Sequence, residues 1–237
     1  MSPAMTEIVF PDPQGYADLA TLVRRARQAD PEAAVRLQVA GRVLRVWVGV
    51  LPGSGLLADG AAVGVRGIEL AGEAQGGAAA GAGASELDVV CAGAALTERF
   101  AHDGVGACRL SVPPASTYAA WAGALPPAAG WSAAGSIPAA ALIDAARGGI
   151  AEIAEGVDAD HTGVPAGSRA VQQLRRRVWS RPVAVRTGAP AVGIPAGAAF
   201  AAYVLGFVPE PSPTVRVWVS GRWVRLQTAH GHVLARP

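Results

Sequence analysis

The sequence of 237 residues contains no lysine, two cysteines and four histidines. Without lysine, Schiff-base catalysis is excluded, and four histidines leave few arrangements for acid–base catalysis by imidazole. Cys91 and Cys108 are too few for a disulfide framework in a chain of this length. We therefore expect both cysteines to be reduced core residues in a cytoplasmic protein.

Long apolar runs are also missing. A membrane-spanning helix needs about 18 consecutive apolar residues, and the longest candidate, residues 190–208, is interrupted by glycine and proline. Residues 1–10 have neither the basic nor the apolar region of a signal peptide. These absences predict a protein without a membrane partner.

Catalytic and metal-binding motifs are absent as well: the sequence has no P-loop, no Gly-x-Ser-x-Gly and no His-Glu-x-x-His. Residues 53–58 resemble a dinucleotide-binding turn, but Asp59-Gly60 stands where that motif requires a helix. His230 and His232 would share one side of a strand, yet zinc needs at least one more ligand. The acidic segment from Glu152 to His161 lacks the spacing of a calcium loop. We expect no metal and no cofactor, and an enzyme with scattered catalytic groups is the least favoured alternative.

What is present is arginine, which supplies all 20 basic residues, together with 30 glycines and 18 prolines. This composition is typical of a high-GC bacterium. Residues 1–160 hold 10 arginines against 17 acidic residues, a net charge of −7. Residues 161–237 hold 10 arginines against one acid, Glu210, a net charge of +9. Such asymmetry indicates an anionic partner or self-complementarity.

Hydrophobic periodicity predicts the elements of the first half of the chain. The helix over residues 16–30 carries Arg24, Arg25 and Arg27 near its end, where we expect them to be solvated. The predicted strands are 7–11, 34–39, 43–50, 61–70, 87–90 and 108–112, with a short helix over 96–101 and a turn at Ala40-Gly41. Residues 71–84, almost all glycine and alanine, are predicted to form a flexible loop.

The second half begins with a connecting segment over residues 113–135, held in place by Trp121 and Trp131. The pattern then predicts helices over 138–156, 168–180 and 195–207, followed by strands over 214–219, 222–228 and 232–236.

An internal duplication links the two halves. Residues 35–46 match residues 215–226 at a constant offset of 180, with six of twelve positions identical. We therefore predict an α+β fold of two related helix-plus-antiparallel-hairpin units with pseudo-two-fold symmetry, which can share one sheet. The predicted domains are an acidic unit over 1–115, a connector over 116–136 and a basic unit over 137–237.

The C-terminal hairpin carries the first candidate site. With Ser220-Gly221 as the turn, Trp218 would oppose Trp223, and Arg216 would oppose Arg225, on the face away from the core. Arginines beside aromatic rings are how single-stranded nucleic acid is held. The alternative is a self-contained patch of cation–π contacts, or a face that packs on another part of the chain.

The second candidate site is the run Arg175-Arg176-Arg177, with Arg169, Arg181 and Arg186 nearby. These side chains can neutralise phosphates or pair with the acidic half of the chain. A winged helix-turn-helix is disfavoured because the helix over 195–207 offers only Tyr203 as a donor to a base edge.

The sequence thus favours a non-catalytic cytoplasmic binding or scaffolding protein that binds a protein partner or self-associates through its unlike-charged halves. The alternative is a nucleic-acid-binding protein that uses the basic half. The predicted binding residues are Arg175, Arg176, Arg177, Arg216, Trp218, Trp223 and Arg225.

Overall fold

The computed structural model describes residues 6–53, 58–72, 87–113, 117–123, 125–158, 168–184, 192–210 and 214–237. The fold is α+β, as predicted, and the chain divides into two compact units. The first comprises residues 1–50 and 65–123, and the second residues 51–64 and 124–237. Most of the predicted flexible loop, residues 73–84, lies outside the described residues, so that prediction stays open, as do the predicted domain boundaries.

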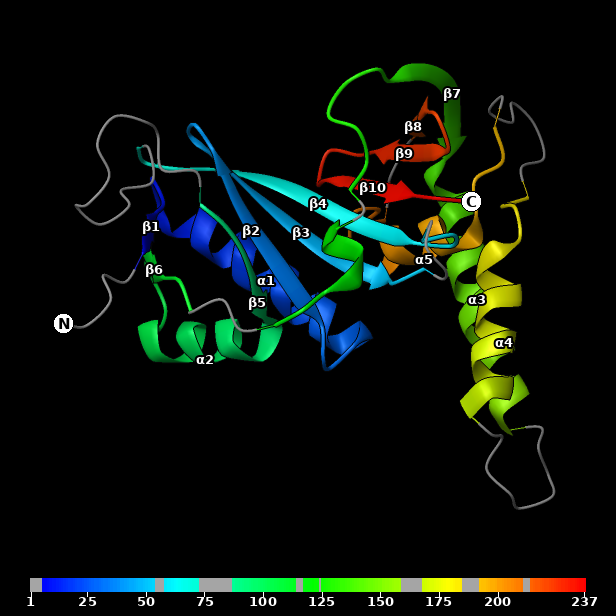
Figure 1. The fold of residues 1–237 in the computed structure, drawn as a ribbon, viewed down its shortest axis with the longest axis horizontal. Helices are drawn as coiled ribbons and strands as arrows, with labels where there is room; N and C mark the ends of the chain where they lie inside the picture. Colours follow the sequence, from blue (N-terminus) through cyan, green and yellow to red (C-terminus); the bar gives the residue numbers. More distant parts are fainter. Residues whose placement is uncertain are drawn as a thin grey trace. The chain divides into compact units, whose positions relative to one another are not determined.

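The first unit contains a small sheet and a larger one (Figure 1). The elements are β1 (Glu7–Val9), α1 (Pro13–Ala29), β2 (Ala34–Ala40), β3 (Val43–Leu51), β4 (Ala62–Glu69), β5 (Asp88–Ala92), α2 (Gly93–Asp103), β6 (Arg109–Ser111) and a 3-10 turn (Ala120–Gly123). Strands β1 and β6 pair antiparallel, and the larger sheet has the order β5-β2-β3-β4.

Helix α1 shows how the sequence produces these elements. Asp12 caps it, because its carboxylate accepts hydrogen bonds from the N–H groups of Gln14 and Gly15. Pro13 occupies the first helical position, where no N–H is needed. The buried residues recur at helical spacing and form one face of the helix: Tyr16, Leu19, Leu22, Val23 and Ala26.

The second unit contains one antiparallel sheet and three helices. Its elements are β7 (Ser132–Pro138), α3 (Ala139–Asp158), α4 (Ser168–Ser180), α5 (Ala196–Val204), β8 (Thr214–Ser220), β9 (Trp223–Gln227) and β10 (His232–Ala235). The strand order is β10-β9-β8-β7, and residues 62–64 of β4 also belong to this unit. The core face of β8 and β9 carries Val215, Val217, Val224 and Leu226, as predicted.

Strand β7 is the element that the sequence did not predict. Its residues, Ser-Ala-Ala-Gly-Ser-Ile-Pro, lack the alternation of apolar and polar side chains that indicates a strand, and only Ile137 is buried. The segment is extended because it pairs with β8, with a register irregularity between Ala133 and Gly135. Part of the predicted connector is therefore a strand.

The duplication is confirmed at the level of elements. Strands β2 and β8 both span seven residues and start 180 positions apart, and β3 and β9 also start 180 positions apart. Each hairpin follows a helix, α1 in one unit and α5 in the other. In each unit the first hairpin strand also pairs with a strand that leads directly into a helix, β5 before α2 and β7 before α3.

Both predicted hairpin turns are wrong by one residue. Ala40 pairs with Val43 and Ser220 pairs with Trp223, so the two-residue loops are Gly41-Arg42 and Gly221-Arg222. The glycines have φ of +59° and +55°, which a type II′ turn requires at its first central position. Glycine adopts this conformation without the steric cost that a side chain would bring.

The corrected register changes the cross-strand pairs of the C-terminal hairpin. Trp218 opposes Arg225, and Arg216 opposes Gln227, so the predicted pairs Trp218–Trp223 and Arg216–Arg225 are wrong. Each cross-strand partner on β9 lies two residues further along the chain than predicted. Because side chains alternate with a period of two, the predicted assignment of residues to the two faces is still correct.

Candidate functional site

Helix α4 carries the predicted arginine run and packs on α3 and α5. Two glycines of α3, seven residues apart, let the helices approach closely. A Cβ at Gly149 would overlap the ring of Trp179, and a Cβ at Gly156 would overlap Leu174. The ring of Trp179 in turn stacks on Phe200 of α5, with 4.4 Å between the ring centres. One side of α4 is thus fixed against the helical layer of its unit.

The other side of α4 is polar and exposed. At 100° per residue, Arg169 and Arg176 lie in the middle of this side, about 10.5 Å apart along the helix, and Arg175 and Arg177 lie at its edges. Gln172, Gln173 and Ser180 are exposed on the same side. Within the described parts of the chain, no carboxylate forms an ion pair with any of these four arginines. We call Arg169, Arg175, Arg176 and Arg177 the α4 arginine face.

Other arginines of the basic region are neutralised within the second unit. Arg181 donates two hydrogen bonds to Glu152, at 2.6 and 2.8 Å, and this pairing lowers the pKa of the Glu152 carboxyl below its ordinary value. Arg222 and Arg236 approach Asp59, at 3.2 and 3.9 Å. Among the described arginines of residues 161–237, those without an ion pair therefore form two groups, the α4 arginine face and Arg216 with Arg225 on the C-terminal hairpin, while Arg186 lies outside the described residues.

The outer face of the C-terminal hairpin holds a stack of three side chains. The guanidinium carbon of Arg225 lies 4.6 Å from the ring centre of Trp131 and 5.1 Å from that of Trp218. Trp131 is fixed by the hydrogen bond that its Nε1–H donates to the carbonyl oxygen of Pro127, at 3.0 Å. The cation–π contacts that the sequence allowed as an alternative are thus present here.

Trp223 is less available than the sequence suggested. Its side chain is buried, with 7% exposed, and the guanidinium carbon of Arg236 lies 5.9 Å from its ring centre. Little of this indole remains for stacking on a nucleotide base.

The structure separates the seven predicted binding residues into two surfaces. Arg175, Arg176 and Arg177 lie on α4, in the helical layer of the second unit. Arg216, Trp218, Trp223 and Arg225 lie on the side of the sheet that faces away from its apolar core residues. A role for either group in binding stays a prediction.

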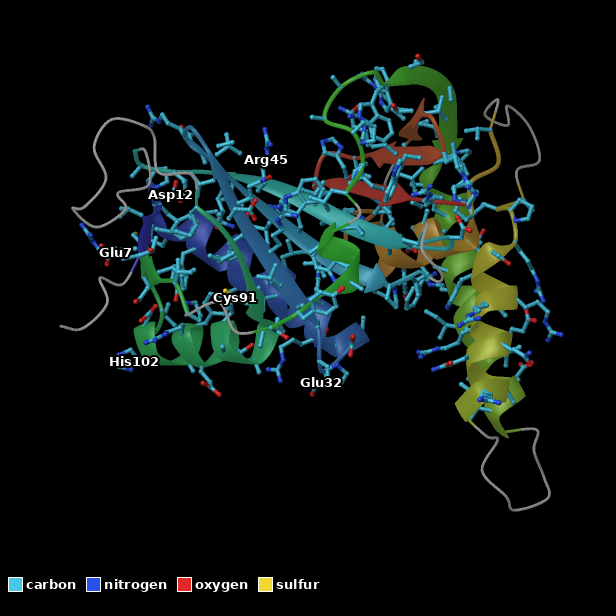
Figure 2. The ribbon with its side chains drawn as sticks, in the orientation of Figure 1. Glu7, Asp12, Glu32, Arg45, Cys91 and His102 are labelled. Atoms are coloured by element: carbon cyan, nitrogen blue, oxygen red, sulfur yellow. The ribbon has the colours of Figure 1, made fainter. Side chains whose placement is uncertain are left out.

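Among the described residues of the first unit, no arginine stacks on an indole as Arg225 does. At the offset of 180, Arg45 corresponds to Arg225 and Gln38 to Trp218. Arg45 projects from β3 and is exposed (Figure 2). The outer faces of the two hairpins have therefore diverged while their backbones have kept the same pairing.

The sequence did not reveal a groove between α1 and α2 in the first unit. This groove has a volume of about 540 Å³. Its lining residues are Ala20, Thr21, Arg24, Arg27, Gln28, Thr97, Phe100 and Ala101. Arg27, predicted to be solvated, is half-buried and donates a hydrogen bond to the hydroxyl of Thr97, at 3.2 Å. Helical periodicity could place these arginines near the end of α1, but only tertiary packing brings α2 beside them.

The remaining candidates are the histidines, the cysteines and the acidic segment before His161. Among the described residues, no three His, Cys, Asp or Glu side chains are grouped as metal ligands require, and His161 lies outside that set. Cys91 is buried on β5, and its burial raises the pKa of its thiol to about 11 (Figure 2). His102 is exposed at the C-terminal end of α2 (Figure 2). No helix of the described chain is long and apolar enough to cross a membrane.

Family models match both halves of this two-unit α+β protein. Residues 4–123, more than half of the chain, match the model described as "Domain of unknown function (DUF8010)". The chain belongs to this family. Residues 126–237 match a second model, described as "Domain of unknown function (DUF8185)". A comparison with curated proteins gives no match.

Among solved structures, the chain is similar to bacterial DNA sliding clamps. The DNA polymerase sliding clamp of Caulobacter crescentus is 13% identical, with a TM-score of 0.49, over 98% of this chain and 65% of that one. The sliding clamp of Pseudomonas aeruginosa is 12% identical, with a TM-score of 0.44, over 98% of this chain and 63% of that one. The chain therefore spans less than two thirds of the length of these structures.

Proposed function

We propose that this chain is a non-catalytic binding protein whose α4 arginine face binds the phosphate backbone of nucleic acid. The observation that carries the proposal is the ion pairing of the second unit. Arg181, Arg222 and Arg236 form ion pairs with carboxylates. The four arginines on α4 form no ion pair with any carboxylate whose side chain is described, although the charge of Arg177 also acts on Glu152 and helps to lower its pKa. Exposed guanidinium groups without an internal counterion are available to an external anion.

The side chains around these arginines favour a phosphate backbone over a protein surface. Protein interfaces depend on a few buried aromatic or apolar anchors, and the exposed side of α4 presents arginine, glutamine and serine. Guanidinium groups bind phosphate oxygens in bidentate geometry, and glutamine amides add neutral donors. A helix of 13 residues is about 20 Å long and can contact several phosphates.

Self-association through unlike-charged halves, one form of the binding or scaffolding role that the sequence favours, rests on the charge asymmetry alone. Several acids of the first unit already have internal partners. Asp88 hydrogen-bonds to Arg36, at 2.6 Å, and Glu7 hydrogen-bonds to Arg109, at 2.6 Å. Asp18 pairs with Arg66. These pairs reduce the acidic surface that a second copy of α4 could bind.

The test is a titration of labelled single- and double-stranded DNA 20-mers with the full chain, followed by fluorescence anisotropy from about 50 to 200 mM salt. Binding is expected to fall with salt, with a log–log slope of about −0.7 per contact on single strands and −0.9 on duplex. The double variant Arg169→Gln/Arg176→Gln should weaken binding, and its log–log slope should be less steep by the equivalent of about two phosphate contacts. Arg222→Gln, which removes a paired arginine elsewhere in the unit, is the control.

The outcomes of these titrations decide between nucleic-acid binding and self-association. The absence of binding at about 50 mM salt, where nonspecific contacts are strong, would end the proposal, as would equal binding by the double variant and wild type. Sedimentation in the same buffers measures self-association: a dimer that dissociates as salt rises, without DNA binding, would favour the scaffolding function instead.

A further inference from the structure

The outer face of the second unit's sheet has a row of four polar side chains that crosses four strands. Ser136 of β7 pairs with Arg216 of β8, Arg216 with Gln227 of β9, and Gln227 with His232 of β10. Directly paired residues have their Cβ atoms about 5 Å apart on the same face. A hydroxyl, a guanidinium, an amide and an imidazole are thus placed side by side.

The next row of the same face contains the indole stack. It crosses the sheet through Ala133, Trp218, Arg225 and Leu234. Arg225 and Arg216 are diagonal neighbours on β9 and β8, close enough to contact one ligand group. Two like charges at this separation repel each other, which costs free energy unless an anion compensates.

Neither row contains an acidic residue. Among the described residues, neither Arg216 nor Arg225 has a carboxylate within ion-pair distance. The buried polar atoms nearby also lack partners. Trp218 Nε1 and Arg225 Nε are N–H donors with no acceptor, and His232 Nδ1 has no hydrogen-bond partner. The face therefore has an excess of donors and positive charge.

The stack fixes Arg225 before any ligand arrives. Trp131 and Trp218 both lie against its guanidinium group, with ring centres 4.6 and 5.1 Å from the guanidinium carbon, and these contacts restrict the positions that the group can adopt. A guanidinium held in this way loses little conformational entropy when it binds a planar or tetrahedral oxyanion. Arg225 is therefore preorganised for binding, unlike a solvated arginine on the surface.

We propose that Arg216 and Arg225 form a binding site for the oxyanion group, phosphate or carboxylate, of a small ligand, with Ser136, Gln227 and His232 as flanking polar groups. This site is separate from the α4 arginine face and does not depend on nucleic-acid binding. The indoles of Trp131 and Trp218 give the ligand's remaining atoms an apolar surface beside the charged group.

The electrostatics of the neighbouring histidine agree with this assignment. Burial, and then the charge of Arg225, lower the pKa of His232 below its ordinary value. Burial likewise lowers the pKa of Arg225. The contribution of Arg225 to the His232 shift shows that the two groups act on each other, and a bound oxyanion would supply a negative charge beside both.

The experiment is a titration of the full chain at constant ionic strength, observed by 1H–15N NMR of the indole N–H groups. The probes are inorganic phosphate, phenyl phosphate, acetate and benzoate, each balanced with sodium chloride. We expect a saturable shift of the Trp218 resonance, assigned with Trp218→Phe, and no shift for Trp121, which lies in the first unit. Comparing the phosphates with the carboxylates identifies which oxyanion the site prefers.

The variants separate this site from the α4 arginine face. Arg216→Gln changes an exposed residue outside the stack and should weaken binding roughly tenfold to a hundredfold. Arg176→Gln on α4 should leave the affinity unchanged. The proposal fails if none of the four probes gives a saturable shift, or if Arg216→Gln binds as tightly as wild type.

Discussion

Trp218 of β8 lies directly opposite Arg225 of β9, with the guanidinium carbon 5.1 Å from the centre of the indole ring. This pairing follows from a turn at Gly221-Arg222. A turn one residue earlier would have placed two indoles opposite each other and two arginines in the next row. The position of one glycine thus determines whether Arg225 lies directly opposite an indole or directly opposite Arg216.

The stack should contribute to stability. Trp131→Ala removes one of the two rings that cover Arg225 and is expected to lower the free energy of unfolding by about 0.5–2 kcal/mol, because the contact is partly desolvated. Trp131→Phe keeps an aromatic ring and should lose less, although it removes the hydrogen bond to Pro127. Urea unfolding of both variants measures the difference, and equal losses would show that the ring contributes little.

The contact between α3 and α4 can be tested at two adjacent glycines. Gly149→Ala would push a methyl group into the Trp179 ring, which should cost about 1–3 kcal/mol through overpacking. Gly148→Ala meets no atom within 4 Å and should stabilise the helix by up to about 1 kcal/mol. Thermal and urea unfolding compare the pair, and opposite signs are the expected result. A stabilising Gly149→Ala would mean that the two helices do not pack this closely.

His232 should make stability depend on pH. Burial lowers its folded-state pKa below the ordinary value of 6.5, so the unfolded chain binds the proton more readily. Its contribution is therefore fully present above about pH 6.5 and decreases as the pH falls from there toward the folded-state pKa. His232→Gln should flatten the pH dependence of the free energy of unfolding in this window. Urea unfolding between pH 5 and 8 provides the measurement, in steps of about 0.5.

The cysteines should react at different rates. Burial of Cys91 raises its thiol pKa to about 11, and the thiolate is the reactive form. Cys108 is only half-buried. Iodoacetamide at pH 8 is expected to modify Cys108 first, and Cys91 should react at a comparable rate only after denaturation. Peptide mass mapping over time distinguishes the two, and early alkylation of Cys91 in the native chain would contradict its burial.

Local sequence patterns predicted most of the helices and strands, because apolar periodicity and turn residues can be recognised within a few consecutive residues. The helix over 168–180 and the strands of both hairpins follow from apolar periodicity, and the offset of 180 located the duplication. The outward face of the C-terminal hairpin was also predictable, since strand periodicity assigns faces without knowledge of the turn. The turn itself was misplaced, because alternation is equally satisfied when a strand shifts its partner by two residues.

The sequence by itself determined the composition of the two candidate surfaces: arginines in a run on one helix, and arginines among tryptophans on one hairpin. Tertiary structure decided what each arginine contacts. Arg181 meets Glu152 across 29 positions, and Arg225 meets Trp131, which directly precedes a strand that carried no sequence signal. Such contacts depend on the distance between segments remote in sequence. Charge and aromatic content can therefore be counted from the sequence, but only the folded chain shows which charges are compensated and which remain available to a ligand.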